Sequence, residues 1–303
     1  MDTYSHLANS ARSIVDLTNS ERISYIYRDH LIKFDQFNYV TSELDRLFHY
    51  PRQIRMPCML LMGPTGVGKT KAVSAFMRRY RPDAQSQIGG FINPHPVVIM
   101  QMPAEPTQQE FLLKMLRAVN APVTSAMKVS DLERMLVSIL RDVGTRIIII
   151  DEFHNLNSST ARQRQIVINT IKNLTNDTSI PIVAVGTSAA QLTIKYDDQM
   201  SHRFRPVEMQ PFKPGKSLDE FLRTVVAHLP LRQRSNIDTR EFKKRLLDLT
   251  GGITVNLLRL LSDSAALAIQ TGAESLTLDS LSLVPAPLLS IPRQRKEPPF
   301  TSA

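Results

Sequence analysis

The chain has 303 residues, of which 42% are hydrophobic and 21% are charged, so its composition excludes disorder over the whole length. Its 37 Lys and Arg residues exceed its 28 Asp and Glu residues, and the net charge of +9 favours a polyanionic partner. No apolar run approaches the roughly 18 residues of a membrane span, and the first 20 residues do not resemble a signal peptide. We therefore expect a cytoplasmic protein without a membrane partner.

The elements predicted along the first 185 residues change from helices to alternating strands and helices. Apolar spacing predicts two helices within the first fifty residues, at 20–34 and 41–48. Short apolar runs then predict buried strands at 58–62, 97–102, 146–150 and 180–185. Helical patterns between or after them lie at 69–80, 108–119, 130–143 and 161–173. This alternation predicts the α/β class, with a parallel sheet between helices.

Beyond residue 210 only helical patterns remain, at 218–228, 239–250, 255–271 and 278–284. The sequence thus predicts a small all-α domain after the α/β core. We expect four parts in chain order: an N-terminal helical segment at 1–50, the core at 51–210, the all-α domain at 211–283 and a tail at 284–303. The tail is rich in proline and basic residues, so we expect it to be disordered.

A glycine-rich motif follows the first predicted strand and opens a helix, which is the context that a phosphate-binding loop requires. Its residues are Gly63, Pro64, Thr65, Gly66, Val67, Gly68, Lys69 and Thr70. The glycines let the backbone N–H groups point at phosphate oxygens, and the helix N-terminus adds its dipole. Lys69 is expected to contact the β- and γ-phosphates of ATP, and Thr70 to bind Mg²⁺.

Two acidic residues end the strand predicted at 146–150. Asp151 is expected to hold Mg²⁺ beside the phosphate loop, and Glu152 to act as the general base that polarises the attacking water. The alternative is a strand that merely ends in two carboxylates. Asp151-Glu152-Phe153-His154 also fits the D-E-x-H box of nucleic-acid helicases, but no other helicase motif is present, so His154 is interpreted as a packing or supporting residue.

Two later residues are candidates for sensing the γ-phosphate. Thr187 follows the strand at 180–185 and is interpreted as a sensor, with a helix N-cap as the alternative. Arg203 is interpreted as a finger that reaches the γ-phosphate of a neighbouring subunit, with Arg205 as the second choice. Surface arginines are common, so an ordinary surface role is the alternative for both.

The order of these motifs resembles an AAA+ ATPase, and further segments resemble the TniB/TnsC family of ATP-dependent regulators of bacterial DNA transposition. The resemblance covers about residues 20 to 283. Its segments are Glu21-Arg22-Ile23, Pro51-Arg52-Gln53-Ile54-Arg55-Met56-Pro57, Asp151-Glu152-Phe153-His154-Asn155-Leu156, Leu229-Pro230-Leu231-Arg232 and Ala265-Ala266-Leu267-Ala268-Ile269.

The resemblance implies an AAA+ core with a helical lid, which uses ATP and Mg²⁺ and forms a ring or helical filament on double-stranded DNA. It also implies a transposase partner and a TniQ-type target selector. AAA+ lids often carry a sensor arginine shortly after a glycine, and this chain has none directly after Gly251-Gly252. Arg259 is one candidate for that role, and a lid that does not sense nucleotide through arginine is the other.

Contacts to the DNA backbone are expected in the segment before the helix predicted at 130–143. Relatives use this region for DNA, and Thr124, Ser125 and Lys128 are the candidate phosphate contacts, binding without sequence readout. An ordinary loop between two helices is the alternative.

Two other functions stay open at this point. One is a different AAA+ role, of the origin-loader or secretion type, and the other is an interaction scaffold that binds nucleotide without hydrolysing it. The presence of Lys69, Thr70, Asp151 and Glu152 argues against the scaffold, because such a protein does not need the base.

Overall fold

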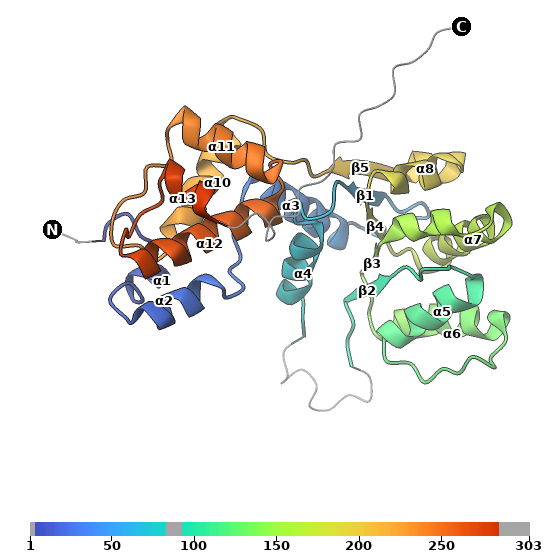
Figure 1. The fold of residues 1–303 in the computed structure, drawn as a ribbon. Helices are drawn as coiled ribbons and strands as arrows, with labels where there is room; N and C mark the ends of the chain where they lie inside the picture. The colour runs from blue at the N-terminus through green and yellow to red at the C-terminus, as the bar shows by residue number, and fades with distance from the viewer. Residues whose placement is uncertain (1–3, 83–92, 285–303) are drawn as a thin grey trace, which may run out of the picture. The chain divides into compact units, whose positions relative to one another are not determined.

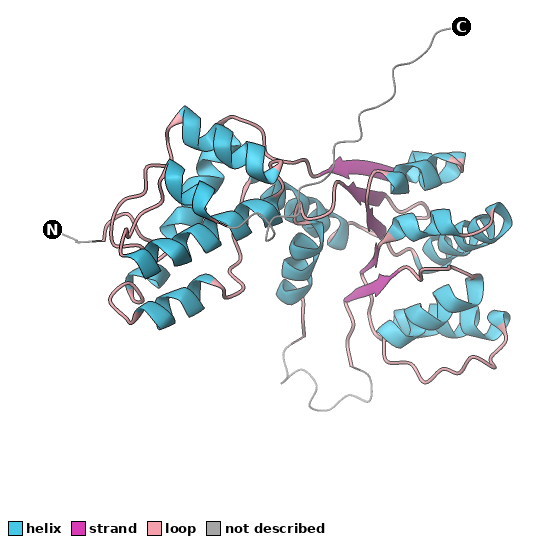
Figure 2. Cartoon of the chain, in the orientation of Figure 1, coloured by secondary structure: helices cyan, strands magenta, loops and turns pink. Residues whose placement is uncertain are grey.

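A computed structural model describes residues 4–82 and 93–284, and these residues form two compact units. The core unit comprises the described residues of Gln36–Gln210. The helical unit combines the described residues of Met1–Asp35 with those of Pro211–Ala303. Figure 1 follows the chain through both units, and Figure 2 distinguishes the sheet from the helices. The predicted tail at 284–303 lies, apart from Val284, outside the described residues.

The core unit contains a five-stranded parallel sheet with the order β2-β3-β4-β1-β5. Its strands are β1 (Cys58–Met62), β2 (Val97–Gln101), β3 (Ile147–Asp151), β4 (Ile182–Gly186) and β5 (Phe204–Glu208). The first four lie where the apolar runs predicted them. The predicted α/β class with a parallel sheet is confirmed.

Strand β5 was not predicted from the sequence. Among the described strands it pairs only with β1, so it lies at the border of the sheet. Arg205, Pro206 and Glu208 are exposed, and only Phe204 and Val207 are buried. Proline is tolerated at such a border because it lacks the backbone donor that a central strand needs. This mixture of residues gives no apolar run that sequence patterning can detect.

Helices cover both faces of the sheet, with α4 on one face and α5, α6 and α7 on the other (Figure 1). Alternate strand residues such as Cys58, Val98 and Ile148 pack into one apolar cluster with residues of α5, α6 and α7. Leu60, Met100 and Ile150 join that cluster because side chains repeat every second residue along a strand. The helices of the core unit are α3 (Asp35–Phe48), α4 (Lys69–Arg79), α5 (Gln108–Ala118), α6 (Val129–Asp142), η2 (Phe153–Ser158, a 3-10 helix), α7 (Ala161–Thr178), α8 (Ala189–Lys195) and α9 (Asp198–Arg203).

The helical unit joins two segments that are far apart in the sequence. Its helices are α1 (Asn9–Arg12), α2 (Asn19–Ile26), α10 (Lys216–Ala227), α11 (Arg240–Thr250), α12 (Thr254–Thr271) and α13 (Leu278–Leu283). The fully buried guanidinium of Arg22 in α2 forms a two-pronged ion pair with Glu274 and donates to the carbonyl oxygen of Pro230 at 3.1 and 2.7 Å. Burial raises the pKa of Glu274, but the hydrogen bonds and charge of Arg22 outweigh it, so the pKa lies below its ordinary value.

The N-terminal region differs from its prediction in two ways. The predicted segment at 1–50 is divided, because residues before 36 pack in the helical unit and α3 belongs to the core unit. In the core unit Asp45 of α3 accepts a hydrogen bond from the hydroxyl of Tyr80 at 2.9 Å, which fixes α3 against the end of α4. Helix α3 also begins before the predicted start at Thr41, whose buried hydroxyl donates to the carbonyl of Asn38 instead of capping a helix.

Among the described residues, no single helix is long and apolar enough to cross a membrane. One bent pair, Arg240–Thr250 with Thr254–Thr271, passes the same test by length and composition alone.

Candidate functional site

The loop from Gly63 to Thr70 connects the end of β1 to the start of α4. Gly66 and Gly68 have φ angles of +84° and +105°, a region that residues with a side chain rarely adopt. Gly68 is the N-cap of α4 and makes no side-chain cap, so the first N–H groups of the helix lack the usual side-chain acceptor there. This strand–loop–helix geometry is suited to binding a phosphate group.

Lys69 lies in the first turn of α4 and folds over the loop. Its ammonium nitrogen donates to the carbonyl oxygens of Gly63 at 2.8 Å and Pro64 at 2.9 Å. Burial lowers the pKa of Lys69 below its ordinary value, and the charges of Asp151 and Glu152, which raise it, do not compensate fully. The two partners of the ammonium group are neutral carbonyls, which a phosphate oxygen can replace with a stronger, charge-assisted bond.

The hydroxyl of Thr70 and the carboxylate of Asp151 meet although 81 positions separate them. The Thr70 Oγ1 donates to Asp151 Oδ2 at 3.2 Å, and Asp151 Oδ1 accepts the N–H of Glu152 at 2.8 Å. The described residues contain no group of three or more His, Cys, Asp or Glu that could hold a metal by themselves. One hydroxyl and one carboxylate fit Mg²⁺, which in nucleotide sites takes its other ligands from phosphates and water.

Glu152 lies between the end of β3 and the beginning of η2. Its φ of +53° is in the left-handed region, which is uncommon for a residue other than glycine and marks a constrained turn. Its side chain is 40% exposed, and Oε2 lies 3.3 Å from Nδ1 of His154. Glu152 is thus beside the phosphate loop and open to a water molecule. Sequence patterning did not reveal the approach of His154, because nothing in the spacing specifies it.

Thr187 directly follows β4, whose last residue, Gly186, pairs with Met62 at the end of β1. This register places Thr187 at the same edge of the sheet as the phosphate loop. Thr187 stands at the start of α8, where its carbonyl oxygen accepts the N–H of Ala190 at 2.9 Å, but its side chain makes no cap. No hydrogen bond among the described residues involves the Thr187 hydroxyl, which leaves it available for a ligand.

Arg203 lies at the opposite edge of the sheet. It ends α9 and directly precedes β5, whose first residue pairs with Cys58 at the start of β1. Five strand residues at about 3.3 Å each separate this edge from the phosphate loop by ~16 Å, which is longer than an arginine side chain. Its guanidinium donates to the side-chain oxygen of Asn176 at 2.9 Å. Arg203 therefore does not reach the phosphate loop of its own chain.

Arg205, the second candidate finger, has partners inside the core unit. Its guanidinium lies 3.2 Å from the carboxylate of Glu43 and 3.3 Å from the hydroxyl of Tyr39. These contacts tie Arg205 to α3, so Arg203 is the better candidate for a contact outside the chain.

The candidate DNA contacts Thr124, Ser125 and Lys128 are all exposed. They lie in the segment between α5 and α6, where the side-chain amide of Gln109 donates to the carbonyl of Ser125 at 2.7 Å. That bond holds the segment next to the start of α5, which follows the carboxyl end of β2. Strand β2 is three positions from β1 in the sheet, ~14 Å at the usual strand spacing. The candidate sensor Arg259 is an exposed residue of α12 in the helical unit.

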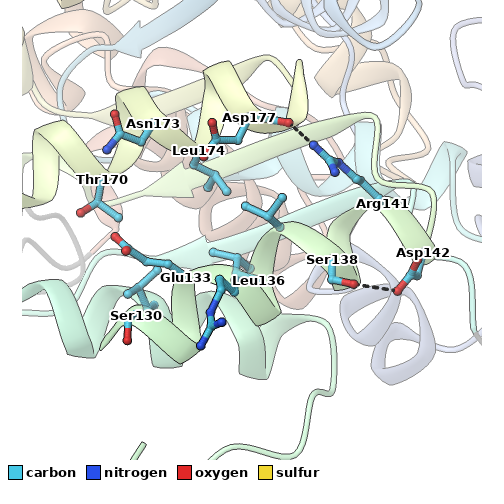
Figure 3. A pocket seen from close by; sticks show the side chains of 13 residues that line it. Ser130, Glu133, Leu136, Ser138, Arg141, Asp142, Thr170, Asn173, Leu174 and Asp177 are labelled. Atoms are coloured by element: carbon cyan, nitrogen blue, oxygen red, sulfur yellow. Dashed lines mark hydrogen bonds between the residues drawn. The ribbon is translucent and has the colours of Figure 1, made fainter. Parts of the chain in front are cut away.

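A hollow of about 850 Å³ lies between α6 and α7 of the core unit (Figure 3). Leu136 and Leu174 line its apolar part, and Glu133 and Arg141 lie among its polar residues (Figure 3). Arg141 donates to the carbonyl oxygen of Asp177, and none of the predicted phosphate, magnesium or DNA residues lines this hollow. The phosphate site and the hollow are therefore separate features of the core unit.

The geometry of the sheet, the phosphate loop and the carboxylates defines the fold as that of an AAA+ P-loop ATPase. Solved structures agree: Cdc6p from Pyrobaculum aerophilum matches with a TM-score of 0.58 at 16% identity, over 83% of this chain and 67% of that one. The Aeropyrum pernix ORC1 protein in complex with DNA matches with a TM-score of 0.57 at 16% identity, over 86% and 67%. The Aeropyrum pernix ORC2 protein, solved in ADPNP–ADP complexes, matches with a TM-score of 0.55 at 14% identity, over 85% and 69%.

The amino-acid sequence identifies the family. The sequence model of the family described as bacterial TniB protein matches residues 22–214, and the chain belongs to the TniB family. No curated protein matches the chain. At these identities the solved structures show the fold alone, whereas the family match includes the phosphate loop, both carboxylates and Arg203.

Proposed function

We propose that this protein is an ATPase that assembles on double-stranded DNA and regulates transposition. The observation that carries the proposal is the convergence, at the carboxyl edge of one sheet, of a phosphate loop, the Thr70–Asp151 pair and a water-accessible Glu152. A scaffold that only binds nucleotide needs the phosphate loop and the Thr70–Asp151 pair, but it does not need Glu152.

Each residue has one role in this proposal. Lys69 exchanges the carbonyls of Gly63 and Pro64 for phosphate oxygens, and Thr70 and Asp151 hold Mg²⁺. Mg²⁺ neutralises phosphate charge when it is bound with the nucleotide. Glu152 accepts a proton from the attacking water, and Thr187 donates its free hydroxyl to the γ-phosphate or that water.

The place of Arg203 supports an oligomer. It lies about one strand length from its own phosphate loop, so in this proposal a second copy of the chain supplies the arginine of each site. A head-to-tail arrangement of this kind generates a ring, or a helical filament when the rotation does not close.

The DNA and the remaining partners follow from the family and the charge. Membership of the TniB family supports a transposase as the partner and, with it, a TniQ-type target selector. The net charge of +9 and the exposed Thr124, Ser125 and Lys128 support contacts to phosphates rather than to bases. The ORC1 structure was solved in complex with DNA, which agrees with DNA as the polyanion.

DNA binding is tested by fluorescence anisotropy with two labelled duplexes of unrelated sequence, at several KCl concentrations, with ATP, with ADP and without nucleotide. We expect binding that requires ATP, differs little between the duplexes and weakens steeply with salt. A random polyanion such as heparin serves as the competitor control. Equal binding without ATP, strong preference for one duplex, or an affinity independent of salt would contradict the proposal.

A further inference from the structure

The side chain of His154 carries a buried polar atom that the proposed mechanism does not yet use. Its Nδ1 is inaccessible to solvent and has no hydrogen-bond partner among the described residues. A buried nitrogen in this state costs free energy unless it is paired in some functional state. The atom lies 3.3 Å from Oε2 of Glu152, within reach of a hydrogen bond but not aligned to make one.

The end of β4 holds the imidazole in this position. A Cβ atom at Gly186 would lie 3.3 Å from His154 Nδ1 and 3.1 Å from the Cβ of Ala190, so only glycine leaves ordinary space there. The ring therefore packs directly against the residue that precedes Thr187. His154 contacts both the candidate base and the strand that carries the candidate sensor.

The backbone of Glu152 is fixed, while its side chain is not. Its N–H is bonded to Asp151 and its φ of +53° is constrained, but its carboxylate accepts no hydrogen bond from a described residue and is 40% exposed. A carboxylate in that position needs a donor to define which oxygen faces the water. Hydrogen bonds at active sites are often long or poorly aligned before the substrate is bound.

We propose that His154 is a positioning residue for ATP hydrolysis: its Nδ1–H donates to one oxygen of Glu152 and directs the other toward the attacking water. This inference rests on the proposed ATPase function. The contact of His154 with Gly186 links the orientation of the base to the end of β4, so that the base is aligned when Thr187 is engaged.

Three variants of His154 separate positioning from packing. In His154→Asn the side-chain amide nitrogen takes the place of Nδ1, in His154→Gln it takes the place of Nε2, and His154→Leu removes the donor. We expect the Leu and Gln variants to lower kcat about tenfold with KM within twofold of the wild type, because only the orientation of the base changes. The Asn variant should recover most of the lost kcat.

A second measurement needs no turnover. In the protein bound to Mg²⁺ and a non-hydrolysable ATP analogue, ¹⁵N NMR of the imidazole should show the Nδ1–H tautomer of His154, and Glu152→Ala should reduce its population. A wild-type kcat in the Leu variant, or an Asn variant as slow as the Leu variant, would overturn the inference. So would a tautomer unaffected by Glu152→Ala. Normal hydrolysis by Glu152→Gln is a different result, which would instead reject Glu152 as the base and with it the proposed function.

Discussion

The two edges of the sheet in the core unit have different contents. The carboxyl edge gathers the residues to which the proposal assigns phosphate, Mg²⁺ and water: Lys69, Thr70, Asp151, Glu152 and Thr187. The amino edge has Arg203, the candidate finger, which donates a hydrogen bond to Asn176. One chain therefore holds the phosphate loop and the candidate finger Arg203 ~16 Å apart. In the proposed function, a complete site is therefore formed between two copies of the chain.

The largest effect is expected at the carboxyl edge, from Lys69→Ala. The ammonium group makes two hydrogen bonds at the loop, and its loss removes the charge-assisted bonds to the phosphates, about 1.5 kcal/mol or more each. We expect ATP to bind at least about 100-fold more weakly and DNA binding to be lost with it. Titration with a fluorescent ATP analogue measures the change. Arg78→Ala, which removes an exposed charge at the other end of α4, is the control, and ATP-dependent DNA binding by the Lys69 variant would reject the site.

Glu152→Gln should separate binding from hydrolysis at the same edge. The amide has the shape of the carboxylate but cannot accept a proton, so we expect hydrolysis about 10³-fold slower with ATP affinity unchanged. The DNA complex should persist because ATP remains bound. Phosphate release and DNA dissociation are measured side by side, with Glu110→Gln on the exposed start of α5 as the control. Hydrolysis at the normal rate would show that another group activates the water.

Arg203→Ala tests the amino edge. We expect ATP affinity close to that of the wild type and hydrolysis slower by about 10²-fold, because the lost group stabilises the transition state of a neighbouring site. Arg205→Ala, whose arginine is paired with Glu43, is the matched control and should have a much smaller effect.

Mixing Arg203→Ala with Lys69→Ala distinguishes the two edges directly. Each variant alone lacks one half of every site, but an interface between them joins an intact Lys69 to an intact Arg203. Recovery of part of the hydrolysis in the mixture is the expected result. Its absence would count against a role of Arg203 across a subunit boundary.

The smallest effect is expected from Lys128→Ala. The exposed side chain neutralises one phosphate in the proposal, so the log–log slope of DNA affinity against salt should become less steep by about 0.9 per bound subunit. All duplex sequences should be weakened alike. Arg117→Ala near the C-terminus of α5 is the control, because it removes an exposed charge outside the candidate DNA segment. An unchanged slope would exclude Lys128 from the DNA contact.

The sequence was sufficient for features that depend on neighbouring residues. The phosphate loop is a contiguous motif, and Asp151 and Glu152 follow a run of four isoleucines that is buried on both faces. The carboxyl ends of parallel strands lie at one edge of a sheet, so the predicted alternation of strands and helices already implies that these two segments meet.

Features that depend on distant residues were not predictable in this way. The pair of Arg22 and Glu274 joins a residue of α2 to one in the connection between α12 and α13, 252 positions away, and no local pattern specifies it. The contact of His154 with Gly186 also depends on how β3 and β4 pair. Strand β5 was missed because Pro206 and two exposed charged residues conceal a border strand.

The division of the helical unit has a consequence for synthesis of the chain. A ribosome makes α2 before the core unit and the segment with Glu274 after it, so Arg22 lacks Glu274 as a partner while residues 36–210 emerge. The core unit has its complete sheet within that stretch, and domains generally fold as units during synthesis. We therefore expect the core unit to fold first. The helices before residue 36 can pack into the helical unit only after the C-terminal helices have left the exit tunnel.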